Sequence, residues 1–384
     1  MGQLIAGPFA SCILGYFGAE VIKIESPGDG DPIRQWRVLQ DGTSLWWRSI
    51  GRNKKCITLN LREERGREIA RDLARQSDVL IENFRPGTLE RWGMSPDTLK
   101  ASNPDLIVAR ISGYGQTGPY ATRPGFASVC EGIGGLRYVN GFPGEAPVRP
   151  NLSLGDSLAG LHAAFGVALA IIARERGQGD GVVVDVAIYE SIFNMLEAVI
   201  PEFDGAGIIR EPSGSTLTGI APTNTYKCQD GRFVVIGANG DSIYKRLMTA
   251  MKRGDLADDP RLAYNPGRVE HQQELDAAIT TWTGSLDADT VLNILEDAAV
   301  PSGPIYNAAD MLTDPHFNAR EMFHSVEIDG KPLKIPAITP KLDGNDGATR
   351  WPGPAVGAHN SEIYEELLGM SQETVATLRD AGVV

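Results

Sequence analysis

The chain is poor in the side chains that build disulfide scaffolds and metal sites. Its 384 residues include 4 cysteines and 5 histidines. The cysteines stand far apart, at Cys12, Cys56, Cys130 and Cys228, and form no Cys-x-x-Cys pair. No two histidines have the spacing of metal ligands. We therefore expect reduced thiols, no disulfide and no metal site, as is typical of a cytoplasmic protein.

Positive charge is scarce as well. The sequence holds 36 Lys and Arg against 49 Asp and Glu, a formal net charge of −13. Such a charge repels nucleic-acid backbones and anionic lipid headgroups. No uninterrupted apolar run reaches the roughly 18 residues of a spanning helix, and the first residues lack the basic segment of a signal peptide. We expect no nucleic-acid partner, no membrane partner and no targeting segment.

The sequence does contain a regular alternation of strand and helix signals. Short apolar runs predict strands, and amphipathic or small-residue runs predict helices between them. Because strands that alternate with helices pair in parallel, we expect an α/β fold with helices on the sheet faces. The strands are expected at residues 20–25, 56–61, 78–82, 106–111 and 182–186, and the helices at 64–76 and 157–174.

The length of the chain exceeds that of one average domain. Residues 202–223 lose periodicity and collect Gly, Pro, Ser and Thr, which is typical of a crossover between domains. We expect a large domain over residues 1–205, a small domain over 206–325 and a C-terminal return to the large domain over 326–384.

Basic residues gather in one segment of this acidic chain. Residues 48–91 hold eleven Lys or Arg against seven Asp or Glu, a local charge of about +4. Arg65, Arg67, Arg71 and Arg75 share one predicted helix with acids at pairing distance, so we expect ion pairs there. Arg52, Asn53 and Lys54, and the turn at residues 83–87, follow or flank strands, and we expect them to bind a phosphorylated ligand.

Asp156 stands directly before the longest predicted helix. An acid there can cap the helix by accepting a backbone hydrogen bond. A carboxylate held beside a glycine at a helix start can also serve as a covalent nucleophile. The sequence contains no Gly-x-Ser-x-Gly elbow and no phosphate-binding Gly-x-x-x-x-Gly-Lys loop. Both roles of Asp156 stay open on spacing alone.

Several motifs, in order along nearly the whole chain, resemble those of the class III coenzyme A transferases, the family of carnitine CoA-transferase and bile-acid-inducible protein F. They lie at residues 6–8 (AGP), 18–25 (GAEVIKIE), 52–55 (RNKK), 78–87 (DVLIENFRPG), 112–119 (SGYGQTGP), 155–156 (GD), 367–369 (LLG) and 378–382 (LRDAG). The resemblance implies a Rossmann-like large domain, a smaller α/β domain and an interlocked homodimer. Family members have a strand before the position of Gln3, and its absence would leave the sheet one strand short.

The resemblance also implies the site. Asp156 resembles the family's catalytic aspartate, which carries CoA as an aspartyl-CoA thioester, with acyl-CoA and a carboxylic acid as substrates and no permanently bound cofactor. To the positions that resemble CoA contacts we add Arg85 from the same turn as Asn83. The full set is Ile5, Ala6, Leu59, Asn60, Leu61, Arg62, Asn83, Phe84, Arg85 and Arg91.

The resemblance leaves several activities open. The related 2-methylacyl-CoA racemases need a histidine at the position of Phe126, so a racemase is disfavoured. A formyl-CoA:oxalate-type transferase is in doubt because residues 217–221 retain a single glycine. Residues 113–119 and 147–150 favour a succinyl-CoA-dependent dicarboxylate transferase, in which Arg149 either holds a distal carboxylate or is a surface residue. A non-catalytic CoA-binding protein, with Asp156 as a helix cap, is the remaining alternative.

Overall fold

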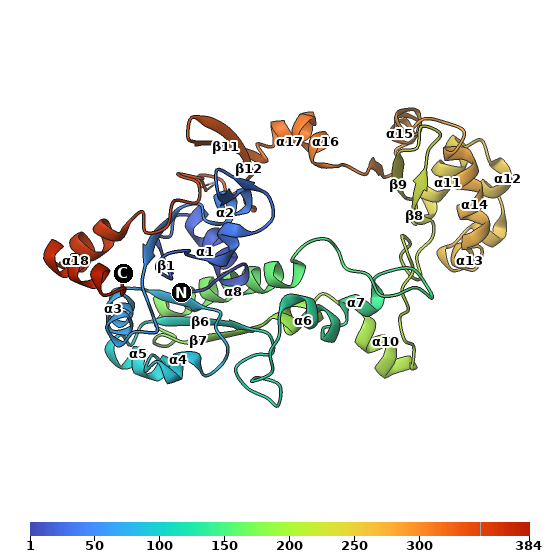
Figure 1. Cartoon of the computed structure of the whole chain (residues 1–384). Helices are drawn as coiled ribbons and strands as arrows, with labels where there is room; N and C mark the ends of the chain where they lie inside the picture. Colours follow the sequence, from blue (N-terminus) through green and yellow to red (C-terminus); the bar gives the residue numbers. More distant parts are fainter. Residues whose placement is uncertain (346) are drawn as a thin grey trace. The chain divides into compact units, whose positions relative to one another are not determined.

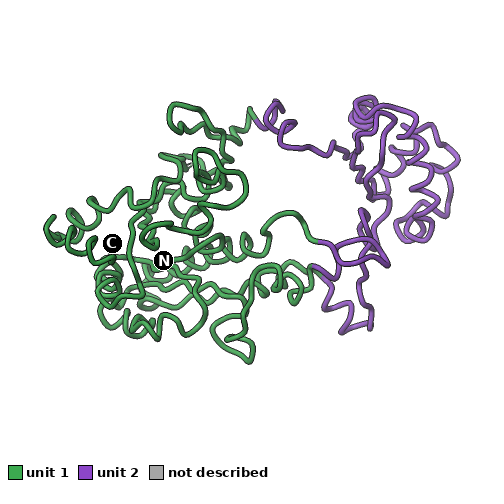
Figure 2. Tube along the Cα trace, in the orientation of Figure 1, with its two compact units in different colours: residues 1–136, 149–197, 318–384 green, residues 137–148, 198–317 purple. Residues whose placement is uncertain are grey.

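The computed structural model describes residues 1–345 and 347–384 and has a mixed α/β fold. The chain divides into two compact units (Figure 2). Unit 1 comprises residues 1–136, 149–197 and 318–384, and unit 2 comprises residues 137–148 and 198–317. The large and small domains expected from composition have their limits at 205/206 and 325/326, several residues after the corresponding limits of the units.

Unit 1 holds the strands and helices of the first half of the chain and its C-terminal return (Figure 1). Its strands are β1 (Val21–Glu25), β2 (Leu39–Gln40), β3 (Thr43–Ser44), β4 (Lys54–Thr58), β5 (Val79–Glu82), β6 (Ile107–Ser112), β7 (Val183–Ala187), β11 (Phe323–Ile328) and β12 (Lys331–Pro336). Its helices are α1 (Ala6–Tyr16), η1 (Pro32–Gln35), α2 (Leu45–Ile50), α3 (Glu64–Arg75), α4 (Thr88–Arg91), α5 (Pro96–Ser102), α6 (Ala127–Ile133), α8 (Leu154–Glu175), α9 (Ile188–Phe193), the π-helix η3 (Glu362–Leu367) and α18 (Gln372–Asp380).

The parallel strand pairing predicted for the first 190 residues is confirmed. Strand β1 pairs in parallel with β4, with Ile24 opposite Ile57. Strands β5, β6 and β7 pair in parallel in that order. These strands form two separate sheets, however, and a cavity of about 440 Å³ lies between β1 and β5, lined by Val21–Ile24 and Val79–Ile81.

Helix α8 spans 22 residues, most of which have small or apolar side chains. It packs against α1, β6 and β7. A side chain at Gly160 would place its Cβ 2.8 Å from the Ala6 carbonyl oxygen, so glycine is what lets α1 approach α8. By length and composition alone α8 could also cross a membrane, with a third of its most apolar window buried. In unit 1 one side of α8 is packed, and apolar side chains such as Phe165, 60% exposed, lie on another side.

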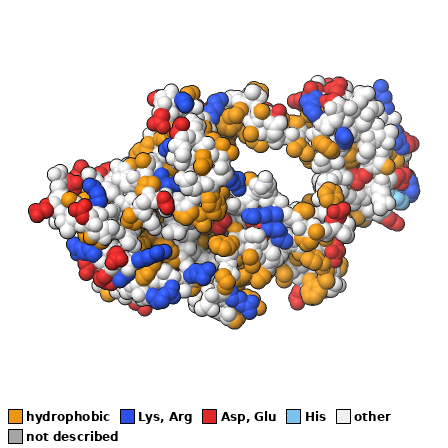
Figure 3. Space-filling view, in the orientation of Figure 1, with side chains coloured by type: hydrophobic (Ala, Val, Ile, Leu, Met, Phe, Trp, Pro, Cys, Tyr) orange, Lys and Arg blue, Asp and Glu red, His pale blue; other side chains and the backbone are white. Residues whose placement is uncertain are grey.

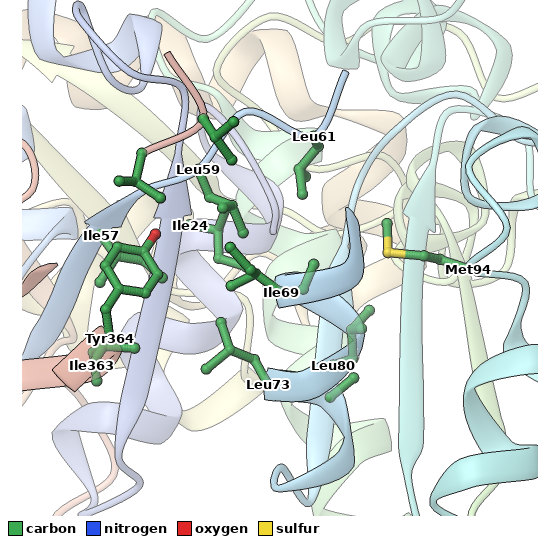
Figure 4. Close-up of a cluster of buried hydrophobic side chains, with 14 of the residues drawn as sticks. Ile24, Ile57, Leu59, Leu61, Ile69, Leu73, Leu80, Met94, Ile363 and Tyr364 are labelled. Carbon is green, nitrogen blue, oxygen red and sulfur yellow. The ribbon is translucent and has the colours of Figure 1, made fainter. Parts of the chain in front are cut away.

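A shared hydrophobic core joins the two sheets through helix α3 (Figure 4). Ile69 and Leu73 of α3 lie between Ile24 of one sheet and Leu80 of the other. Helix α3 has a strongly amphipathic sequence, so its apolar side faces this core while its arginines stay outside. The C-terminal segment also reaches this core, through residues such as Tyr364. The start and the end of the chain therefore form one folded unit.

Unit 2 is built on an antiparallel sheet in the order β10-β9-β8, backed by helices. The strands are β8 (Thr223–Lys227), β9 (Phe233–Gly237) and β10 (Ser302–Pro304). The helices are α10 (Val199–Ala206), α11 (Asp241–Ala250), α12 (Gly254–Ala257), η2 (Pro260–Leu262), α13 (Asn265–Glu270), α14 (Gln272–Thr283), α15 (Ala288–Asp297) and α16 (Ala308–Thr313), while α7 (Leu136–Val139) and α17 (Pro315–Ala319) straddle the unit limits.

Candidate active site

A cavity of about 770 Å³ lies in unit 1. Its walls come from the segments that follow β5 and β6, from the start of α1 and from the start of α8. The carboxyl ends of parallel strands are where α/β folds bind ligands. The cavity is large enough for part of a cofactor-sized molecule.

Asp156 lines this cavity as the third residue of α8. The residue that precedes the helix, Ser153, makes no side-chain capping bond. The Asp156 carboxylate has no hydrogen-bond partner among the described residues, so it does not cap the helix either. Burial, together with the negative charge of Glu131, raises the pKa of Asp156 from 3.8 to about 6, while Arg149 acts in the opposite direction. The carboxylate is therefore half-buried, unbonded and open to a substrate in the cavity.

Glu131 of α6 lies at the start of α8, beside Gly155 and Asp156. Its side chain is fully buried, and its Oε1 accepts the Gly155 N–H at 3.3 Å. Its Oε2 lies 3.4 Å from Nε of Arg149. A side chain on Gly155 would place its Cβ 3.1 Å from Cγ2 of Ile188, so the glycine lets the start of α8 lie close to α9. Two carboxylates and one guanidinium thus meet at the start of α8.

The turn after β5 is fixed by hydrogen bonds from the strand end. Glu82 Oε2 accepts the Phe84 N–H at 2.7 Å, and Glu82 Oε1 accepts Nε of Arg110 at 2.8 Å. Phe84 packs edge-on against Trp92, with ring centroids 5.2 Å apart. These contacts hold the aromatic side of the cavity in place.

The start of α1 is fixed from two directions. Asn83 hydrogen-bonds both backbone groups of Gln3. Asp31 accepts the Leu4 N–H at 3.0 Å and pairs with buried Lys23 at 2.6 Å. Leu4 has a φ of 62°, a left-handed conformation that is strained for leucine and often found at functional sites. Ile5 and Ala6, the next two residues, line the cavity.

The charge of the cavity lining is strongly positive. Four arginines and one acid, Asp156, are its charged residues in the described chain; the arginines are Arg37, Arg85, Arg123 and Arg149. The guanidinium of Arg123 stacks on Tyr120 at 3.6 Å from the ring centroid, and that of Arg37 stacks on Trp46 at 4.4 Å. Guanidinium groups held by ring stacking favour phosphate and carboxylate ligands.

The chain is similar to known proteins in sequence and in fold. A model of the family described as "CoA-transferase family III" matches residues 1–360. The chain belongs to this family. It is 45% identical to the succinyl-CoA--D-citramalate CoA-transferase of Chloroflexus aurantiacus, over 100% of this chain and 96% of that one. It is 39% identical to the alpha subunit of the succinyl-CoA--L-malate CoA-transferase of Chloroflexus aurantiacus, over 100% of this chain and 90% of that one. The crystal structure of a CAIB/BAIF family protein from Brucella suis matches with a TM-score of 0.83 and 32% identity, over 96% of this chain and 97% of that one.

The structure brings only part of the predicted ligand set to the cavity of this CoA-transferase. The residues that line it are Ile5, Ala6, Asn83, Phe84, Arg85, Arg149 and Asp156. Leu59 and Leu61 do not line it, because their side chains lie in the hydrophobic core. The remaining three, Asn60, Arg62 and Arg91, also lie outside the lining; the last two are exposed.

The ligand role expected for Arg52, Asn53 and Lys54 is wrong. All three are at most 3% exposed. Arg52 donates to the Pro336 carbonyl at 2.6 Å, Asn53 donates to the Ala348 carbonyl at 2.6 Å, and Lys54 donates to the Pro8 carbonyl at 2.9 Å. Burial lowers the pKa of Lys54 to about 8. These side chains tie β4 to α1 and to the C-terminal segment.

The ion pairs expected for the arginines of α3 are confirmed. Arg65 pairs with Glu68 at 2.7 Å, Arg67 and Arg71 each pair with Glu64 at 2.7 Å, and Arg75 pairs with Asp72. The local excess of positive charge in residues 48–91 is therefore used mostly for structure. Of the four arginines in the cavity, only Arg85 comes from that segment.

Sequence reasoning missed Glu131, Ser112 and the arginines Arg37 and Arg123. The Ser112 hydroxyl is buried at the edge of the cavity, and no partner for it is found among the described residues. A signal for Ser112 was present, because it directly follows the strand predicted at residues 106–111 of an α/β fold. Nothing in the spacing of Glu131 distinguishes it from a solvent-facing helix residue.

Proposed function

We propose that this CoA-transferase moves CoA from succinyl-CoA to a dicarboxylic acid through a covalent intermediate on Asp156. The unbonded Asp156 carboxylate in an arginine-lined cavity is the observation that carries this proposal. The names of the two relatives from Chloroflexus aurantiacus support succinyl-CoA as the donor and a branched or hydroxylated dicarboxylic acid as the acceptor.

The chemistry needs no general base, since an ionised carboxylate is itself the nucleophile. An oxygen of Asp156 attacks the thioester carbon of succinyl-CoA, the C–S bond breaks, and its electron pair leaves with the CoA sulfur. The thiolate then attacks the Asp156 carbonyl of the mixed anhydride and expels succinate. The acceptor carboxylate attacks the resulting aspartyl-CoA thioester and displaces the thiolate. Attack of the thiolate on the acceptor's acyl carbon releases Asp156 unchanged.

Other residues of the cavity have separate tasks in this proposal. In this proposal, positive charge for the CoA phosphates comes from Arg37, Arg85 and Arg123. The exposed Arg62 and Arg91 lie outside the cavity, where they can contact the part of CoA that extends beyond it. Arg149 holds the distal carboxylate of the dicarboxylic acid. The unpartnered Ser112 hydroxyl is available to donate to the oxyanion of each tetrahedral intermediate. CoA is a substrate here, and the proposal includes no permanently bound cofactor.

The decisive test compares Asp156→Ala with Asp72→Ala, an exposed acid of α3. We expect Asp156→Ala to lower kcat by at least about 10³-fold, as loss of a nucleophile does. Mass spectrometry of the wild-type protein mixed with succinyl-CoA should show a CoA adduct on Asp156 that the variant lacks. Asp72→Ala should retain wild-type turnover. Near wild-type exchange in Asp156→Ala would leave a CoA-binding protein as the better description.

An acceptor screen with labelled succinyl-CoA tests the substrate class. We expect D-citramalate, L-malate or mesaconate to accept CoA much faster than acetate, because a monocarboxylate has no second carboxylate to bind Arg149. Preference for oxalate with formyl-CoA would favour the other transferase type. Incorporation of deuterium at the α-carbon of a 2-methylacyl-CoA would indicate a racemase.

We also propose the assembly that the family resemblance implies. In it, unit 1 is a Rossmann-like CoA-binding domain, unit 2 is the small domain, and two chains interlock as a homodimer. An apolar row along α8 supports a partner, since Leu161, Phe165, Leu169 and Ile172 are each between 47% and 60% exposed and lie on one side of the helix. Apolar side chains also reach the surface on the face drawn in Figure 3. Light scattering of the wild type and of Phe165→Glu tests this assembly.

Four buried, unpaired cysteines support a cytoplasmic location as part of the same proposal. Fractionation of cells that express the native gene tests it, with the protein expected in the cytosolic fraction.

A further inference from the structure

The start of α8 has an unusual division of roles between two carboxylates. In most helices the residue at the cap, or an acid in the first turn, accepts the first free backbone N–H groups. Here Ser153 provides no side-chain cap, and the Gly155 N–H is taken by Glu131, a residue of another helix, at 3.3 Å. The Gly155 N–H, next to the nucleophile, is therefore satisfied without using the Asp156 carboxylate.

We infer that Glu131 is a positioning residue for Asp156: it caps α8 at the residue next to the nucleophile and holds a like charge beside the nucleophile. This inference rests on the proposed function of Asp156. The first covalent step converts the anionic Asp156 carboxylate into a neutral acyl group, and the electron pair leaves with the CoA sulfur. A neighbouring negative charge disfavours the free carboxylate and does not disfavour the neutral acyl form. Glu131 therefore favours acylation of Asp156.

Few titratable or charged groups lie close to Asp156. Glu131 and Cys130 of α6 and Arg149 are the titratable or charged neighbours that act on it. Arg37, Arg85 and Arg123 line the same cavity. Strand β6 and helices α1 and α9 contribute only uncharged side chains to the lining. Arg149 pairs with Glu131 at 3.4 Å and is 39% exposed, so a substrate carboxylate can draw it away and leave the two carboxylates facing each other.

Two variants separate the capping effect from the charge effect. Glu131→Gln keeps an oxygen that accepts the Gly155 N–H but removes the charge, whereas Glu131→Ala removes both. Glu190→Gln on α9, an exposed acid outside the cavity, is the matched control. The pKa of Asp156 is followed by NMR of carboxyl-labelled aspartate, assigned with Asp156→Asn. The CoA adduct forms in the step after acylation, so its rate of formation reports any slowing of acylation.

We expect Glu131→Gln to melt near the wild-type temperature, to lower the pKa of Asp156 by at least about half a unit, and to slow acylation by about tenfold. Glu131→Ala should show the same changes and also melt at a lower temperature, while Glu190→Gln should match the wild type. An unchanged pKa of Asp156 and an unchanged acylation rate in Glu131→Gln would overturn the inference. The NMR titration does not depend on turnover, so a wild-type protein that forms no CoA adduct would contradict the proposed function alone.

Discussion

The side-chain amide of Asn83 hydrogen-bonds the backbone of Gln3 through both its oxygen and its nitrogen. Its Oδ1 accepts the Gln3 N–H at 2.7 Å, and its Nδ2 donates to the Gln3 carbonyl at 2.8 Å. The two residues are 80 positions apart in the chain, so this pair connects the turn after β5 to the start of α1. Both segments line the cavity, and the pair therefore sets the distance between two of its walls.

Substitution of Asn83 should weaken substrate binding more than turnover. Asn83→Asp keeps an acceptor for the Gln3 N–H but cannot donate to the carbonyl, and Asn83→Ala loses both bonds. We expect the KM for succinyl-CoA to rise by about tenfold in Asn83→Ala, equivalent to about 1.4 kcal/mol, with a smaller rise in Asn83→Asp. Steady-state kinetics measures this rise.

Asn103→Ala is the matched control for Asn83. The Asn103 amide donates to the backbone carbonyls of Ala74 and Ser77, far from the cavity lining. We expect this variant to be less stable with an unchanged KM. Equal changes of KM in the two variants would show that the Asn83 pair has no special place in binding.

The raised pKa of Asp156 predicts how stability varies with pH. The carboxyl has a pKa of about 6 in the folded protein against 3.8 when unperturbed. Between these values the folded state binds more protons than the unfolded state, so the free energy of unfolding falls as the pH rises through this window. Asp156→Asn should therefore be more stable than the wild type at pH 7.5, by up to about 2–3 kcal/mol.

Urea denaturation at two pH values checks this prediction. The advantage of Asp156→Asn should nearly disappear near pH 3.5, where the wild-type carboxyl is protonated in the folded state and mostly protonated in the unfolded state. Asp72→Asn, at an exposed acid of α3, should show no such gain at either pH. A wild-type protein as stable as Asp156→Asn at pH 7.5 would contradict the raised pKa.

Arg110 of β6 forms a buried ion pair with Glu82 of β5. It is 5% exposed and donates to Glu82, itself 1% exposed, at 2.8 Å. Arg110→Met would leave a buried carboxylate without its main partner, and we expect it to lower the free energy of unfolding by about 3–5 kcal/mol. Arg75→Met, which breaks the exposed pair with Asp72, should cost less than about 1 kcal/mol. Chemical denaturation distinguishes the two, and equal losses would contradict the prediction.

Alanine substitutions at two helical glycines should have opposite effects, because only Gly160 lies where α1 contacts α8. Gly160→Ala places a Cβ 2.8 Å from the Ala6 carbonyl oxygen, so we expect a loss of about 1–3 kcal/mol. Gly205 in α10 has open space around the added Cβ. Gly205→Ala should stabilise that helix by about 0.5–1 kcal/mol, because alanine has the higher helix propensity. Thermal melts measure both effects. An unchanged stability of Gly160→Ala would show that α1 can shift to make room for the added Cβ.

The sequence was most informative where a local pattern decides the structure. The strands expected at residues 78–82, 106–111 and 182–186 are present within one or two residues, because each is a short apolar run between turn signals. The pairing of Arg67 with Glu64 on α3 also follows from helical spacing. Asp156 was singled out by its place before a long apolar helix, and the structure puts it in the cavity.

Features that depend on distant segments could not be read in the same way. Arg52 was expected to bind a ligand because it flanks a strand, yet its guanidinium donates to the Pro336 carbonyl, 284 positions away. Glu131 meets the start of α8 only because α6 folds back against it. The positive charge of the cavity is also assembled from separate segments, which the charge of residues 48–91 did not reveal.

The gap between β1 and β5 has a consequence for the motions of unit 1. Within the described residues, each of these strands pairs along one edge only, while the other edge borders the 440 Å³ cavity. The two sheets are coupled through packed side chains of α3 rather than through a continuous ladder of backbone bonds. Strand β1 is therefore held by backbone bonds along one edge only, and we expect it to open more often than β6. Amide protons of β6, which is paired on both edges, should exchange with solvent far more slowly than those of β1.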